Sequence, residues 1–118
     1  MNTITITPDT LVIEPHGIDR LWSLKRRIQI PLTEVLGAAI DPSVMNEPKG
    51  IPAPGLSFFG RYSGTYMRAG ERSFWSVSPG AGDAIVVVTL TGEYYTRLVL
   101  SVEHPEQVVR DINRVLIG

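Results

Sequence analysis

The side chains best suited to acid–base or metal chemistry lie at the end of the first apolar segment. Glu14, His16 and Asp19 fall within six residues of one another. Carboxylates beside a neutral imidazole can hold a divalent cation or exchange protons near neutral pH. Their spacing matches no metal-binding motif, however, and the letters EPHG are typical of a turn. We interpret them as polar turn residues and expect no metal and no enzymatic role, with acid–base catalysis by His16 as the minor alternative.

The other elements of a catalytic site are missing from the sequence. His104 precedes Pro105, where a helix-capping or exposed residue is the simplest interpretation. No serine stands in a GxSxG pattern, and neither GxGxxG nor GxxxxGK[ST] occurs. The absence of cysteine excludes thiolate catalysis and Cys-ligated metals. We therefore expect no catalytic residues and no cofactor.

One run of three basic residues, Lys25, Arg26 and Arg27, follows Trp22. The simplest interpretation is a solvated entry to a strand. The alternatives are a contact with a partner protein, or a contact with an anionic lipid surface or a small anion, together with Lys49 or Arg61. At roughly 1 kcal/mol for each basic residue near an anionic surface, three charges bind only marginally. The whole chain has a formal charge of -1, so it has no overall field that would attract nucleic acid or membranes. We expect no nucleic-acid binding and at most a weak membrane contact.

Residues 56–75, LSFFGRYSGTYMRAGERSFW, combine aromatic rings with arginines and glycines. Residues two apart on a strand share a face, so Tyr66 and Arg68 are expected to lie together. Two adjacent phenylalanines in a loop rich in proline and glycine either fold onto the core or are offered to a partner. The candidate contact residues for a partner or an anion are Lys25, Arg26, Arg27, Phe58, Phe59, Arg61, Tyr66 and Arg68.

The length and composition of the chain indicate an ordinary globular domain. The chain has 118 residues, of which 43% are apolar and 19% charged, close to ordinary globular usage. We expect one domain spanning residues 1–118, which is long enough to bury a core without disulfides or a structural metal. The first residues, MNTITITPDT, lack the basic and apolar regions of a secretory signal. The chain is therefore expected to start where the domain starts and to be cytoplasmic.

Residue patterns predict the elements that must position these side chains. In the first half we expect a hairpin of strands 3–7 and 10–15, a helical turn over 17–24, a strand over 26–32 and a strand over 34–41. Pro31 cannot donate to a sheet ladder, which places its strand at an edge or ends it there. Residues 41–63, with prolines and glycines throughout, are expected to form a long loop.

In the second half, the strand pattern is stronger. Strands over 64–70 and 72–78 are expected to close around a turn at Gly70. Strands over 84–90 and 94–102 follow, the first apolar on both faces, and both should be central in the sheet. Residues 105–117 predict an amphipathic helix, because Val108, Ile112 and Val115 recur at helical spacing.

The order of these elements, with seven or eight strands first and one helix last, is α+β. The chain resembles the bacterial pleckstrin-homology-like (PH-like) domains, and in particular small actinobacterial proteins of this type. The stretches that carry the resemblance are LVIEPHGIDRLWSLKRRIQIPL, EPKGIPAPG, GERSFWSV and RLVLSVEHPEQVVRDIN. The resemblance implies a bent antiparallel sheet or split β-barrel closed by a C-terminal α-helix, and it implies no reaction. The first turn, Thr7 to Asp9, lacks the basic motif with which eukaryotic PH domains bind phosphoinositides, so that property is not expected here.

These observations favour a non-enzymatic binding or scaffold module that acts through contacts with a protein partner or through self-association. Exposed strand edges and the loop at Phe58 and Phe59 are the expected contact points. A peripheral sensor of anionic lipid or a small anion is the alternative.

Overall fold

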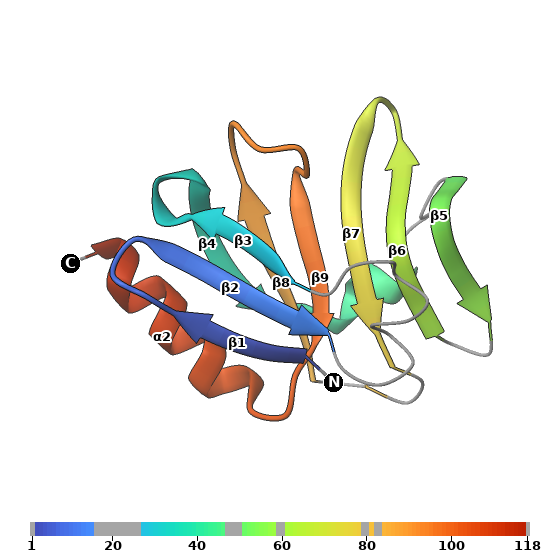
Figure 1. The fold of residues 1–118 in the computed structure, drawn as a ribbon. Coiled ribbons are helices and arrows are strands. Elements are labelled where there is room, and N and C mark those ends of the chain that lie inside the picture. Colours follow the sequence, from blue (N-terminus) through green and yellow to red (C-terminus); the bar gives the residue numbers. More distant parts are fainter. Residues whose placement is uncertain are drawn as a thin grey trace.

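The computed structural model describes residues 2–15, 27–46, 51–58, 61–78, 81 and 84–117. Within them, a three-stranded sheet of order β1-β2-β3 lies in front of part of a six-stranded sheet of order β4-β8-β9-β7-β6-β5 (Figure 1). The strands are β1 Asn2–Ile6, β2 Thr10–Pro15, β3 Ile28–Pro31, β4 Val35–Ile40, β5 Ile51–Phe58, β6 Arg61–Arg68, β7 Glu71–Val77, β8 Ile85–Leu90 and β9 Arg97–Ser101. Two 3-10 turns, η1 Leu32–Glu34 and η2 Pro42–Asn46, and the helix α2 Pro105–Ile117 complete the described elements. The fold is α+β, as predicted, but the two sheets are not closed into a barrel.

Most predicted elements are confirmed. β1 and β2 form the expected antiparallel hairpin, and Pro31 ends β3, which is an edge strand. β8 and β9 are central strands of the larger sheet. α2 begins at Pro105, and the N–H of Val108 donates to the carbonyl of His104 at 3.0 Å, so His104 occupies the N-cap position. The helical turn expected over 17–24 lies outside the described residues.

The long loop predicted for residues 41–63 is wrong. It contains η2 and the whole of β5, which pairs antiparallel with β6. Prolines obscure this strand in the sequence, because a proline cannot donate to a sheet ladder. β5 is an edge strand, however, and its register shifts between Pro52 and Gly55. An edge position with an irregular register is where a strand tolerates proline.

The expected antiparallel sheet is in fact mixed. β9 lies beside β7 and runs parallel to it, while it pairs antiparallel with β8 on its other side. The chain leaves β7, forms β8 one place further along, and returns as β9 into the space between them. β9 also starts later than predicted, at Arg97. Tyr94 therefore lies in the preceding loop, where 57% of its surface is exposed, rather than on the apolar face of the strand.

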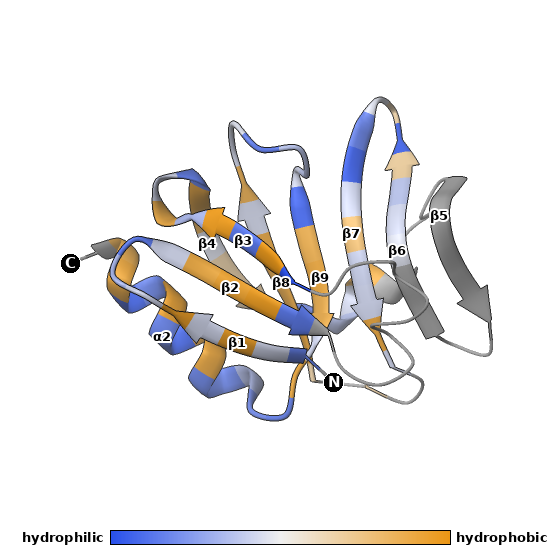
Figure 2. Ribbon diagram, viewed as in Figure 1, coloured by the Kyte–Doolittle hydropathy of each residue, from blue (hydrophilic) through white to orange (hydrophobic). Residues whose placement is uncertain are grey.

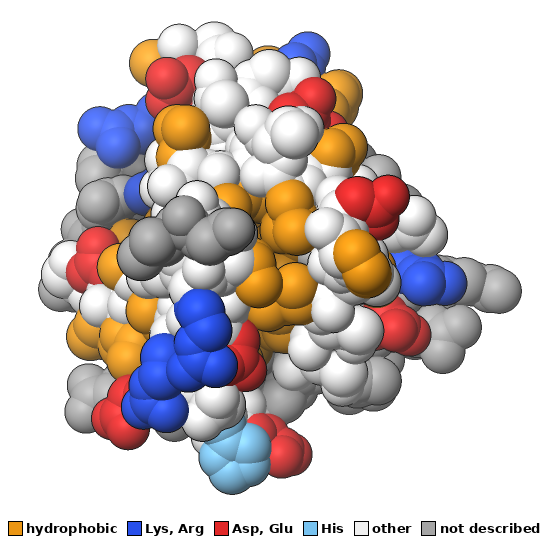
Figure 3. Space-filling view, turned by 90° about the vertical axis from the view of Figure 1, so that its left-hand side faces the viewer, with side chains coloured by type: hydrophobic (Ala, Val, Ile, Leu, Met, Phe, Trp, Pro, Cys, Tyr) orange, Lys and Arg blue, Asp and Glu red, His pale blue; other side chains and the backbone are white. Residues whose placement is uncertain are grey.

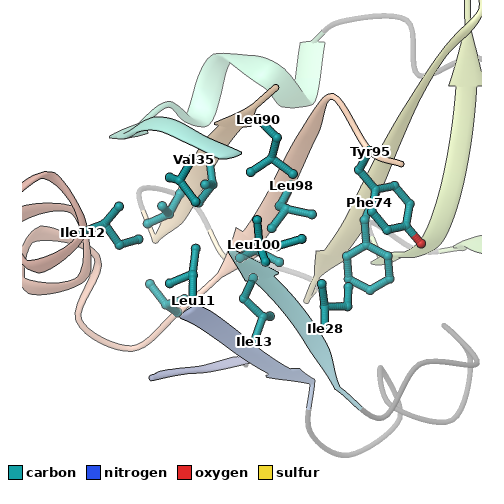
Figure 4. Packing of buried hydrophobic residues seen from close by; sticks show 14 residues of the cluster. Leu11, Ile13, Ile28, Val35, Phe74, Leu90, Tyr95, Leu98, Leu100 and Ile112 are labelled. Atoms are coloured by element: carbon teal, nitrogen blue, oxygen red, sulfur yellow. The ribbon is translucent and has the colours of Figure 1, made fainter. Parts of the chain in front are cut away.

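The main core fills the space between the two sheets and α2. Figure 4 shows Leu11 and Ile13 of β2 pointing toward Leu98 and Leu100 of β9, with Ile112 of α2 closing one end. All five side chains are fully buried. α2 presents alternating apolar and polar residues along its length (Figure 2), as its helical stripe predicts. Burial of Ile112 and partial burial of Val108 and Leu116 fix the helix across one open side of the sheets, whereas Val115, which the predicted stripe includes, is exposed.

A second cluster lies on the opposite face of the six-stranded sheet. Trp75 and Tyr66 pack there edge to face, with ring centroids 6.2 Å apart. Val44 of η2 belongs to the same cluster and is buried. Because both faces of the central strands are covered, β8 is apolar on both sides, as its sequence indicates.

A buried side chain joins the two sheets near the N-terminus. The Nδ2 group of Asn2 donates to the carbonyl oxygens of Ser76 and Ser101, each at 2.9 Å. Asn2 is on β1, whereas its two acceptors are on β7 and β9. These hydrogen bonds hold one end of the small sheet against the large one.

Candidate functional site

A surface groove lies between the edge strand β3 and the loop that connects β8 to β9. Its volume is about 290 Å³. We call it the tyrosine groove, and it is lined by Arg27, Ile28, Gln29, Ile30, Glu93, Tyr94 and Tyr95. One wall is therefore a sheet edge and the other is an aromatic loop.

Tyr94 is held in place although it is largely exposed. The guanidinium carbon of Arg72, on β7, lies 4.4 Å from the centre of the Tyr94 ring. The Tyr95 ring meets Tyr94 edge to face, with centroids 4.9 Å apart. An arginine on one side and a second ring beside it restrict the tyrosine before any partner arrives.

Tyr95 anchors this arrangement in the core. Its side chain is 4% exposed, and its hydroxyl lies 3.1 Å from the Oγ1 atom of Thr65 on β6. Its ring packs against Phe74, with centroids 5.7 Å apart. Because the ring of Tyr95 is buried and its hydroxyl has a hydrogen-bond partner, Tyr95 is fixed and can hold the exposed Tyr94 in position.

The loop that carries the tyrosines is fixed beside η1. The N–H of Thr91 donates to the carbonyl of Glu34 at 2.9 Å, and Gly92 adopts a positive φ of 69°, which a glycine reaches without strain. Glu93 Oε1 then accepts a hydrogen bond from the N–H of Tyr94 at 3.0 Å. This short turn places Glu93 close to Glu34.

The two carboxyl groups interact across this turn. A hydrogen bond with Glu93 raises the pKa of Glu34, because two carboxylates can share such a bond only when one of them is protonated. Partial burial of Glu34 and repulsion from the charge of Glu93 act in the same direction. Among the described residues, no group of three or more histidine, cysteine, aspartate or glutamate side chains is placed to hold a metal ion.

The charges that line the tyrosine groove are of both signs. Arg27 is exposed on one wall, and Glu93 lies on the other. The apolar contribution comes from Ile28, Ile30 and the two rings. This mixture suits a polar and aromatic contact and gives no excess positive charge for an anion.

The structure places the predicted contact residues in different surroundings. Arg27 lines the tyrosine groove, whereas Lys25, Arg26 and Phe59 lie outside the described residues. Phe58, the last residue of β5, pairs with Arg61, the first residue of β6, so both lie in strands rather than in the predicted loop. The side chains of Phe58 and Arg61 are outside the described part.

The expected surface pair of Tyr66 and Arg68 does not form. Arg68 is exposed at the end of β6, but Tyr66 is only 1% exposed and packs against Trp75. The period of the strand does put both residues on one face. That face is covered at Tyr66, so the ring contributes to the core and not to a surface contact.

Of the early acid–base candidates, only Glu14 lies in the described part of the chain. Glu14 is half-buried on β2 opposite Thr3. His16, Asp19, Trp22 and Lys49 lie outside the described residues. His104 is exposed beside the start of α2.

Sequence reasoning missed Glu93, Tyr94 and Tyr95 as site residues. It assigned Tyr94 to a strand face because YYTRLVLSV alternates well from Thr96 onward. The available signal was the preceding TGE turn, which leaves two adjacent tyrosines in or next to a loop. Binding residues lie disproportionately on loops, so this position makes the tyrosine pair a candidate for contacts.

Comparison of the chain with protein-family models, with curated proteins and with solved structures gives no match. Within the part of the chain that the structure describes, no helix combines the length and the apolarity needed to cross a membrane.

Proposed function

We propose that this chain is a non-enzymatic binding or scaffold module of PH-like type, and that its tyrosine groove contacts an extended segment of a partner protein. The observation that carries the proposal is Tyr94, which is 57% exposed yet braced by Arg72 and Tyr95. Tyrosine and arginine are the residue types that dominate binding energy in protein interfaces. A ring that is already ordered loses little entropy on binding.

The size of the tyrosine groove supports a protein partner over a small molecule. At about 290 Å³, it is at or below the lower end of the range of roughly 300–1,000 Å³ for small-molecule sites. This volume accepts one or two side chains of a larger partner. The adjacent edge of β3 ends in Pro31, which cannot donate to a sheet ladder, so the partner segment is expected to bind through side chains seated in the groove rather than by extending the sheet.

The balanced charge of the groove argues against an anion as its ligand. Binding of an anionic lipid or a small anion remains the alternative, through the basic run at residues 25–27. It predicts binding that weakens with salt, because charge attraction is screened.

Affinity capture from lysate of the source organism tests the proposal. The tagged protein is compared with Tyr94→Ser and with Leu36→Ser, which removes a similarly exposed apolar side chain from β4. We expect one protein to be enriched by the parent and by Leu36→Ser, and lost with Tyr94→Ser. Equal enrichment by all three proteins contradicts the assignment of the groove.

Sedimentation with phosphatidylserine vesicles at low salt tests the alternative. Binding that is lost in a triple variant, Lys25→Glu, Arg26→Glu and Arg27→Glu, and retained in Tyr94→Ser favours the lipid sensor. No sedimentation at low salt removes that alternative.

A further inference from the structure

The described strands leave four sheet edges, on β1, β3, β4 and β5. An exposed edge can pair with another chain, and proteins ordinarily block it with proline, charge, a bulge or a covering element. Three of these four edges are blocked in this way. β1 is the exception.

Each of the three other edges has its own block. β3 ends in Pro31. β5 contains Pro52 and Pro54, and its register with β6 is irregular. β4 has a register shift between Val35 and Gly37 and is covered by α2, whose Asn113 occupies the backbone groups of Ala38.

β1 carries no proline, charge or bulge, and among the described elements α2 packs against it far less extensively than against β4. Its residues are NTITI, without proline or charge, and its pairing with β2 runs in unbroken register from Asn2 to Ile6. The N–H of Thr7 donates to the carbonyl of Thr10 on the β2 side. Because backbone groups alternate in direction along a strand, those of Ile4 and Ile6 point toward the free edge.

The sequence of this edge is self-complementary. Residues 3–7 read TITIT, which is the same in both directions about Thr5. When two such strands pair antiparallel about a two-fold axis, threonine meets threonine on the outer face and isoleucine meets isoleucine on the inner face. Threonine pairs and β-branched pairs across strands are both favourable, and no like charges oppose each other.

We propose that β1 pairs with β1 of a second copy of this chain, which joins two three-stranded sheets into one continuous sheet across a two-fold dimer. A two-fold contact requires a surface that is complementary to itself, and the TITIT edge has this property. Because β1 and β3 are opposite edges of the same sheet, the dimer leaves the tyrosine groove open. The inference stands independently of the proposed function.

The surroundings of β1 leave room for this contact. A cavity of about 250 Å³ lies between β1 and the start of α2, lined by Asn2, Thr3, Ile4, Val102, Glu103, His104 and Val108. Figure 3 shows apolar side chains gathered in the middle of the face on which β1 and α2 lie. Ile4, Ile6 and Val108 are only partly buried. A paired strand would cover them, and this apolar burial adds to the backbone hydrogen bonds.

Sedimentation equilibrium over a range of concentrations tests the dimer. An edge of this length buries a small area, so we expect a weak, reversible dimer that forms in the micromolar range or above. Thr5→Lys and Thr5→Glu each place like charges near the two-fold axis and should yield monomers. The side chain of Thr5 is exposed, and circular dichroism verifies that each variant folds. Thr89→Lys, on the exposed face of the internal strand β8, is the matched control and should still dimerise.

Mixing the two charged variants gives the decisive result. If the contact is two-fold about this segment, Thr5→Lys and Thr5→Glu should form a heterodimer with each other at low salt, although neither dimerises alone. A parent protein that stays monomeric up to millimolar concentration overturns the proposal. A dimer that is unaffected by Thr5→Lys, or charged variants that fail to pair when mixed, also overturns it. Capture of a partner through Tyr94 is unaffected by any of these outcomes.

Discussion

The carboxamide of Asn113 and the backbone of Ala38 form a closed pair of hydrogen bonds. The N–H of Ala38 donates to Asn113 Oδ1 at 3.0 Å, and Asn113 Nδ2 donates to the carbonyl of Ala38 at 2.9 Å. One side chain of α2 thus replaces the neighbouring strand that β4 lacks on its free edge. The helix is fixed to the large sheet by this pair as well as by the burial of Ile112.

Replacing Asn113 with alanine should lower the free energy of unfolding by about 1–3 kcal/mol, because two partly buried backbone groups lose their partners. Urea unfolding followed by circular dichroism measures this. Gln107→Ala is the matched control on the same helix, since its amide bonds only to exposed side chains, and it should cost much less. Equal losses for the two variants would show that the Asn113 contact adds nothing to stability.

The turn between β6 and β7 should accept a stabilising substitution. Ala69 has a φ of 54° and Gly70 a φ of 81°, so both residues of this two-residue connection are left-handed. Alanine is strained there, whereas asparagine before glycine is the preferred sequence of such turns. Ala69→Asn should stabilise the protein by up to about 1 kcal/mol. Thermal unfolding checks this, and a lower midpoint than that of the parent would contradict it.

The raised pKa of Glu34 gives a defined pH dependence. The folded state holds this proton more tightly than the unfolded state does, so stability falls as pH rises from the ordinary value of 4.5 through the raised value. At pH values above the raised pKa, Glu34 is ionised and its unfavourable interaction with Glu93 is fully present. This carboxyl pair should therefore make the protein less stable at neutral pH than at lower pH, all other groups being equal.

Glu93→Gln isolates this effect. The substitution keeps an oxygen that can accept from the N–H of Tyr94 but removes the second negative charge. The variant should unfold at a higher temperature than the parent at pH 7, and the difference should disappear below pH 4.5. Glu103→Gln, at an exposed position, is the control. A difference that is constant with pH would show that the carboxyl pair does not account for it.

The sequence predicts the elements whose patterns are local. The hairpin of β1 and β2, the turn at Gly70 and the helix α2 all follow from residue types within one segment. β5 escapes such reasoning, because Pro52 and Pro54 are typical of a loop and only its position at a sheet edge makes them acceptable. The place of β9 beside β7 is likewise a property of the whole sheet.

The candidate site is harder to predict because two distant segments form it. Arg27 comes from the approach to β3, and Tyr94 from the β8–β9 loop, and nothing in either segment indicates that they meet. The burial of Tyr66 was missed for a related reason. The alternation of a strand gives the side on which a residue lies, but whether that side is covered depends on elements elsewhere in the chain, such as η2.

The most direct test of the account is photo-crosslinking from the tyrosine groove. A photoreactive phenylalanine derivative is placed at Tyr94, and in a second protein at Val115, which is exposed on α2. Both proteins are irradiated in cells of the source organism. We predict a discrete adduct with one partner protein from position 94 and no such adduct from position 115. No adduct at position 94, or the same products from both positions, would contradict the claim that the protein binds a partner through this groove.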